Sequence, residues 1–260
     1  MILPLFLMFA AQAGPIDTDG ARFDRCAALV RTDPAAALAE ATRWSVGGGT
    51  WLPRQCAGLA YAAQAKFDDA ARSFENAAAA ARTAQDDHAA RLFAQAGNAW
   101  LAAGDAAKAR AALDSALVQG TLTGLQLGEA RLDHARALVA AGEPDIARRD
   151  IDLALQSAPE DPLAWLLSAT LARRMGDPKR AATDIAEALK RSPDDASVQL
   201  EAGNIAALAG NAARAQEAWA EAARIAPTTP VGRSAKAALA QFATAPAPAT
   251  TPARPATETR

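Results

Sequence analysis

The sequence predicts an all-α protein built as an α-solenoid, a stack of helix-turn-helix pairs. Three observations predict it: an alanine-rich composition, landmarks that recur at a constant interval, and helix-start signals along the chain. The hydrophobic content is 51% while aromatic residues make up only 5%, which suits close helix packing better than a β-sandwich or barrel. The 260 residues are enough for one large or two ordinary domains.

The charge balance does not indicate a polyanionic partner. Lys and Arg number 27 and Asp and Glu 29, so the formal net charge is -2. A chain this close to neutrality has no global field that attracts nucleic acid or an anionic membrane. We therefore expect no nucleic-acid partner.

The N-terminus predicts export. Residues 1–13 form an apolar stretch that closes with Ala11-Gln12-Ala13, the small-x-small pattern that signal peptidase accepts. We expect a signal peptide over 1–13, a mature chain beginning at Gly14, and a periplasmic location. A membrane anchor needs about 20 apolar residues, and this run ends at Gly14 and Pro15. No stable membrane span is expected.

An internal repeat organises the rest of the chain. Two landmarks recur at one shared interval: turn glycines at Gly142, Gly176 and Gly210, and prolines at Pro159, Pro193 and Pro227. Upstream, Ala65 and Gly104 hold the turn position, with slightly longer intervals between them and the later turns. The interval matches the period of about 34 residues that is typical of stacked helical pairs.

Each turn residue has a small residue before it and a bulky one after it. The small residues lie seven positions before the turn: Gly58, Gly97, Ala135, Ala169 and Gly203. The bulky residues lie nine positions after it: Phe74, Leu113, Ile151, Ile185 and Trp219. Small residues let helix axes approach, and larger ones fill the space beside them.

Helix starts follow from Asp-Pro pairs. Asp161-Pro162 and Asp177-Pro178 place a capping acid before a proline at the first helical position, where a missing N–H costs nothing. Asp33-Pro34 has the same layout. This layout predicts a degenerate first repeat within residues 14–50.

These residues resemble the tetratricopeptide repeat (TPR) family over roughly Trp51 to Pro227. The resemblance implies about six repeats in a right-handed superhelix, whose first helices line a concave groove that binds peptides or proteins. We accordingly expect repeats over 51–227 and a capping helix over 228–242, which covers the last apolar edge. Residues 243–260, rich in Pro, Ala and Thr, predict a disordered tail.

The only two cysteines, Cys26 and Cys56, predict a disulfide. An even count in an exported chain favours pairing, and the repeat alignment places both on the first helices of adjacent repeats. The alternative is two ordinary buried thiols. A redox enzyme is less favoured, because no CxxC motif is present.

The sequence offers no catalytic residue, no metal site and no cofactor motif. It lacks HExxH, paired Cys/His spacing, GxSxG and S-x-x-K. Gly47-Gly48-Gly49-Thr50 is not followed by the Lys of a phosphate loop, and is expected to be a plain interhelical loop. His88 and His134 are expected at the surface or between helices. An enzyme is therefore not expected.

The predicted groove supplies the candidate binding residues. If the first helices of repeats three to six face inward, a group of polar, mildly basic residues lies at or near the concave side. These residues are Asn98, Arg136, Thr170, Arg173, Arg174 and Asn204. Asn98 and Arg136 are similar in type to the Asn and Lys/Arg clamp with which some TPR domains hold a peptide carboxylate. The matching lysines are absent, which disfavours that ligand. The alternative is an ordinary solvated polar face.

The hypothesis that follows is a non-enzymatic periplasmic scaffold or adaptor for a protein or peptide of the cell envelope. A second hypothesis is a small-molecule or glycan binder, because an aromatic wall can stack on sugars. That wall would use Trp44, Trp51, Trp100, Trp165 or Trp219. A third hypothesis is an auxiliary subunit of an envelope enzyme.

Overall fold

The computed structural model describes residues 18–48 and 50–244, and over these residues it contains thirteen α-helices and no strand. The helices are α1 (Asp19–Thr32), α2 (Pro34–Val46), α3 (Leu52–Ala63), α4 (Phe67–Thr83), α5 (His88–Ala103), α6 (Ala106–Val118), α7 (Gly124–Ala140), α8 (Pro144–Ser157), α9 (Pro162–Arg174), α10 (Pro178–Arg191), α11 (Ala196–Leu208), α12 (Ala212–Ile225) and α13 (Pro230–Thr244). The signal peptide predicted over 1–13 and the tail from residue 245 onward lie outside the described residues.

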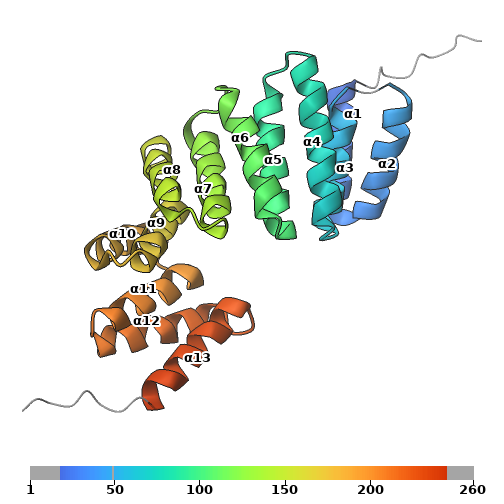
Figure 1. The fold of residues 1–260 in the computed structure, drawn as a ribbon. Helices are drawn as coiled ribbons and strands as arrows, with labels where there is room; N and C mark the ends of the chain where they lie inside the picture. Colours follow the sequence, from blue (N-terminus) through green and yellow to red (C-terminus); the bar gives the residue numbers. More distant parts are fainter. Residues whose placement is uncertain (1–17, 49, 245–260) are drawn as a thin grey trace, which may run out of the picture. The chain divides into compact units, whose positions relative to one another are not determined.

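The chain divides into two compact units, and the division falls within α8, between Asp150 and Ile151. In unit 1, each helix from α1 to α7 packs on the next, and the first helices of successive repeats also touch, α1 with α3 and α5 with α7. In unit 2 the same holds from α9 to α13, where α9 touches α11 and α11 touches α13 (Figure 1). The predicted all-α fold of stacked helical pairs is confirmed.

Capping acids begin the helices as the sequence predicts. The Asp161 carboxylate accepts from the Leu163 backbone N–H at 2.9 Å, and Asp177 accepts from Arg180 N–H at 3.0 Å. Asp33 does the same at the start of α2, accepting from Ala36 N–H at 3.0 Å. Each such bond satisfies one of the orphan donors in the first helical turn.

The five predicted turn residues all adopt the left-handed backbone conformation. The φ angles are 82° at Gly104, 79° at Gly142, 78° at Gly176 and 75° at Gly210. Ala65 holds the equivalent turn between α3 and α4 with φ 56°, although it carries a side chain. Left-handed residues of this kind end a helix by redirecting the chain into the next one.

The alternation of small and bulky residues sets the helix spacing within a repeat. A Cβ placed on Gly97 in α5 would lie 2.4 Å from Leu113 Cγ in α6. A Cβ placed on Gly203 in α11 would lie 2.4 Å from the indole of Trp219 in α12. The paired helices therefore approach as closely as these side chains permit.

The first helical pair has a small core of its own. It joins Cys26, Ala37 and Ala41 of this pair with Cys56 and Ala60 of α3, and Trp44 of α2 is also fully buried. Cys26 in α1 and Cys56 in α3 are joined by a disulfide, with their Cα atoms 6.2 Å apart. This bond links the first helices of two adjacent repeats, the positions that the repeat alignment predicts.

The last helix, α13, packs on α11 and α12 at the end of unit 2. Leu239 and Phe242 pack against the cluster around Trp219, and the Phe242 ring meets the indole edge to face at 5.5 Å. Because α13 ends at Thr244, it extends into the start of the segment that the sequence assigns to the tail. It covers apolar surface that the last repeat would otherwise expose.

Candidate functional site

The six candidate groove residues fall on the first helices of repeats in both units. Asn98 in α5 and Arg136 in α7 belong to unit 1. Those of unit 2 are Thr170, Arg173 and Arg174 in α9 and Asn204 in α11. We call the exposed sides of these helices the first-helix face, and describe it for each unit in turn.

In unit 1, both candidates bind one aspartate that the sequence reasoning did not single out. Asn98 Nδ2 donates to Asp133 Oδ2 at 2.8 Å, and Arg136 Nη1 donates to Asp133 Oδ1 at 2.9 Å. One repeat earlier, Gln55 of α3 donates to Gln95 of α5 at 3.1 Å. The polar residues of this face therefore form a ladder that joins successive repeats.

In unit 2, a second ladder engages Arg173 and Asn204. Arg173 Nε donates to Glu201 Oε1 at 2.5 Å, and Asn204 Nδ2 donates to Glu201 Oε2 at 3.1 Å. Asn204 Oδ1 in turn accepts from Trp219 Nε1 at 3.1 Å. Since the Glu201 side chain is only 8% exposed, its charge depends on Arg173 for compensation.

Two candidates are left available, Thr170 and Arg174. Arg174 is exposed at the end of α9, and among the described residues it forms no ion pair. Leu163, at the start of the same helix, is 46% exposed, and Leu208 of α11 is 70% exposed. Residues 163, 166, 170 and 174 repeat at helical spacing, so they share one side of α9. The available surface of unit 2 thus combines exposed apolar side chains with an exposed arginine.

The tryptophans are structural. Trp44, Trp51, Trp100 and Trp219 are between 1% and 8% exposed. Each donates its indole N–H to a side chain, as Trp100 does to Glu75 at 2.8 Å. Trp165 is half-buried and lies under the Arg191 guanidinium at 5.1 Å. Buried indoles present no free face to a sugar, which argues against the glycan hypothesis.

An open hollow of about 240 Å³ lies where the α4–α5 and α6–α7 connections meet. Its polar lining includes Arg82, Asp86, Asp87 and Thr121. Asp86 is occupied: it accepts from the backbone N–H of His88 and from Trp51 Nε1, each at 2.9 Å. The His88 backbone bond, reinforced by the His88 and Trp51 side chains, holds the pKa of Asp86 below its ordinary value.

The described residues contain no group of three or more His, Cys, Asp or Glu side chains arranged to hold a metal ion. None of the helices in this part of the chain has the length and apolar content needed to cross a membrane. Asp195 caps α11, because its carboxylate accepts from the Ser197 backbone N–H at 2.6 Å.

Stacked helical pairs with left-handed turn residues and matched small and bulky positions define a helical-repeat protein. Comparison with known proteins identifies the family, because the tetratricopeptide repeat model matches residues 132–174 and 166–230. Over these residues the chain consists of tetratricopeptide repeats. No curated protein matches it.

Solved structures share the fold at low sequence identity. PilW, described as a widely conserved type IV pilus biogenesis factor, is 19% identical with a TM-score of 0.69, covering 83% of this chain and 96% of PilW. PilF of Pseudomonas aeruginosa is 13% identical with a TM-score of 0.68, covering 84% and 96%. YrrB, described as a TPR protein with an unusual peptide-binding site, is 20% identical with a TM-score of 0.51, covering 71% and 91%.

Proposed function

We propose that this protein is a non-enzymatic scaffold of the periplasm that binds a segment of a partner protein from the cell envelope. TPR proteins in general bind peptides or proteins, and peptide binding is described for YrrB, which shares the fold. The envelope location is supported by the apolar N-terminal stretch ending at Ala13 and by the Cys26–Cys56 pair.

The observation that carries the binding role is the available first-helix face of unit 2. Leu163 of α9 and Leu208 of α11 are large apolar side chains that are 46% and 70% exposed. On the same two helices, the polar residues Arg173 and Asn204 are already bonded to Glu201. Exposed apolar side chains and an exposed arginine on the first-helix face offer a partner both apolar and charged contacts. We therefore place partner contact at Leu163, Thr170, Arg174 and Leu208.

The test is affinity capture from an envelope extract with identification by mass spectrometry. The parent chain is compared with a variant carrying Arg174→Glu and Leu208→Ser. Arg173 is left unchanged, because an acid at that position would face Glu201 and destabilise the helix pair. The matched control is Val118→Ser, which removes an apolar side chain 79% exposed at the end of α6.

We expect the parent and the Val118→Ser control to retain one discrete envelope protein. The double variant should lose at least about tenfold in capture, corresponding to roughly 1.4 kcal/mol. Equal capture by all three chains would place the partner elsewhere, and the absence of any specific protein would count against the scaffold role. Peptide mapping of protein from fractionated cells tests the location: an N-terminus at Gly14 supports export, and an intact Met1 contradicts it.

A further inference from the structure

His134 occupies a position that other repeats give to a small residue. It lies in α7, eight residues before the turn glycine Gly142. The corresponding residues of the other repeats are Ala57, Ala96, Ser168 and Ala202. The imidazole is only 10% exposed, so an ionisable ring is buried where the helices of the other repeats pack closely.

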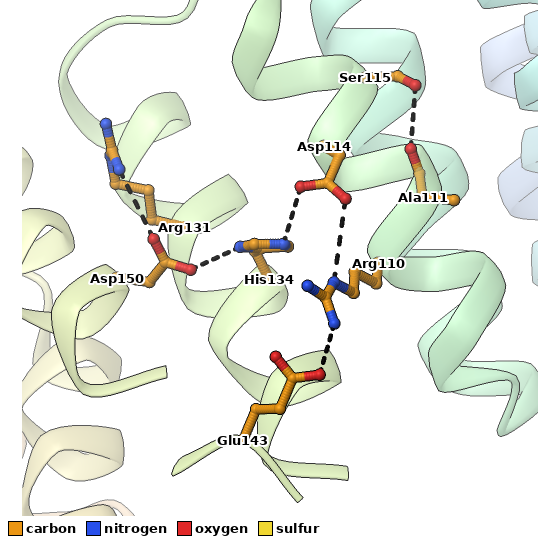
Figure 2. Close-up of polar contacts among 8 residues, drawn as sticks. All are labelled: Arg110, Ala111, Asp114, Ser115, Arg131, His134, Glu143 and Asp150. Carbon is orange, nitrogen blue, oxygen red and sulfur yellow. Dashed lines mark hydrogen bonds and ion pairs between the residues drawn. The ribbon is translucent and has the colours of Figure 1, made fainter. Parts of the chain in front are cut away.

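The ring has a carboxylate at each nitrogen, as Figure 2 shows. Nδ1 lies 2.5 Å from Asp150 Oδ2 in α8, and Nε2 lies 3.2 Å from Asp114 Oδ1 in α6. Nε2 is buried and forms no hydrogen bond of good geometry with any described residue. His134 therefore stands between helices of two successive repeats.

Charged groups of α6 and α7 lie beside the two aspartates. From α6, Arg110 lies 4.0 Å from Asp114, and it pairs with Glu143 of the α7–α8 turn at 2.7 Å. From α7 itself, Arg131 lies 3.7 Å from Asp150. Among the described residues no ion pair joins α5, the other helix packed on α7, to His134.

The next repeat places a permanent cation in the equivalent arrangement. Asp152 and Asp184 stand at the repeat positions of Asp114 and Asp150, ten and eight residues after their respective turn glycines. Arg180 binds both, with Nε 3.2 Å from Asp184 Oδ2. Burial alone would lower the pKa of Arg180, but these two ion pairs raise it above its ordinary value.

In the earlier repeat, the position of Arg180 is held by Ile146. In the later repeat, the position of His134 is held by Ser168, whose hydroxyl donates to the buried Asp184 carboxylate. Thus the later repeat joins its two aspartates through an arginine. The earlier one has only the imidazole between them, and an imidazole carries charge only when protonated.

We propose that protonation of His134 is a pH-dependent link between the third repeat (α5–α6) and the fourth (α7–α8). The neutral ring has a single N–H, which Asp150 can accept, while its other nitrogen turns a lone pair toward Asp114. The imidazolium keeps the contact with Asp150 and carries a positive charge 3.2 Å from Asp114 Oδ1, so it attracts carboxylates of both α6 and α8. Because both carboxylates contact the ring only in the folded chain, the charged ring holds α6, α7 and α8 together more firmly than the neutral ring does.

The experiment compares thermal unfolding of the parent chain with that of His134→Gln at pH 7.5, 6.5 and 5.5, without a histidine tag. We expect the melting-temperature difference between the two to widen by about 2 to 4 °C across this range. The matched control is His88→Gln, which removes the other of the two histidines. Because the His88 ring contacts Asp86 at 2.6 Å, this variant measures the contribution of that pair, and the widening expected of His134→Gln should persist in a chain that lacks His88.

Two more variants keep the proposal falsifiable if His134→Gln folds poorly. Asp114 is 60% exposed, so Asp114→Asn should fold and lose most of the pH dependence. The pair His134→Ser with Ile146→Arg copies the next repeat and should unfold independently of pH. A parent whose stability relative to these variants is constant over the range, or whose His134 proton resonances do not titrate there, would overturn the proposal.

Discussion

Each small residue before a turn is matched in size to a bulky side chain in the following helix. Gly203 faces Trp219, the largest of these side chains, while Ala169 and Ile185 belong to one buried cluster. The Trp219 indole is held in place beside Gly203, because its N–H is bonded to Asn204 and its ring lies edge to face with Phe242. A single methyl group at Gly203 is therefore poorly tolerated.

Gly203→Ala is expected to lower the free energy of unfolding by about 2 kcal/mol, since overpacking outweighs the gain in helix propensity. The measurement is chemical denaturation followed by tryptophan fluorescence. Combining it with Trp219→Ile recreates the Ala169 and Ile185 pair, so the double variant should lose less than the sum of the two single losses. Additive losses would contradict the size-matching account.

At the scale of the helix, the turns explain which residues end each first helix. The turn position is a glycine in four of the five repeats that the landmarks define. A Cβ at Gly142 or Gly176 would meet no atom within 4 Å, so the left-handed backbone angle, and not close packing, explains the glycine. Ala65 departs from the rule, with φ 56° at the α3–α4 turn. A side chain in this conformation costs about 1–2 kcal/mol.

Ala65→Gly should therefore raise the free energy of unfolding by about 0.5–1 kcal/mol, after allowing for the larger entropy of glycine in the unfolded chain. The converse change, Gly142→Ala, should lower it by about 1 kcal/mol without any steric clash. Denaturant midpoints of the two variants, measured beside the parent, should shift in opposite directions. A destabilised Ala65→Gly chain would show that the alanine methyl makes a contact that outweighs the strain.

At the scale of the whole molecule, the repeats are not equally well supported. The core around Phe74, Leu92, Leu113 and Trp100 in unit 1 contains several large side chains, whereas Trp44 is the one large side chain among the fully buried residues of the first pair, beside alanines and Cys26. Apolar stabilisation follows buried area, so the first pair depends more on its covalent link than the others do. The disulfide closes a loop with a sequence separation of 30.

Replacing both cysteines by serine should lower the free energy of unfolding by roughly 3–4 kcal/mol on the chain-entropy estimate. Limited proteolysis should then cut first within α1 and α2. The control is the parent chain treated with reductant, which should behave as the double variant does. Identical stability and cleavage in all three samples would mean that the α1–α3 contacts hold the first pair without the bond.

The sequence by itself determined the helical repeats, their turns and their caps, because each of these depends on residues within one repeat. The Asp177 cap bond and the left-handed Gly176 turn are local, and the constant spacing of the turn glycines exposes them. The position of the cysteines on α1 and α3 also followed from the repeat alignment.

Only the tertiary structure decided which polar residues remain available to a partner. Asn98 binds an aspartate 35 residues away, and Arg173 binds a glutamate 28 residues away, each in the next repeat. A pattern on one helix does not reveal an acceptor supplied by another, so the sequence counted these side chains as groove residues. Whether a polar group on a stacked repeat is free depends on its neighbour, since burial makes an unpaired charge costly and packing supplies its partner.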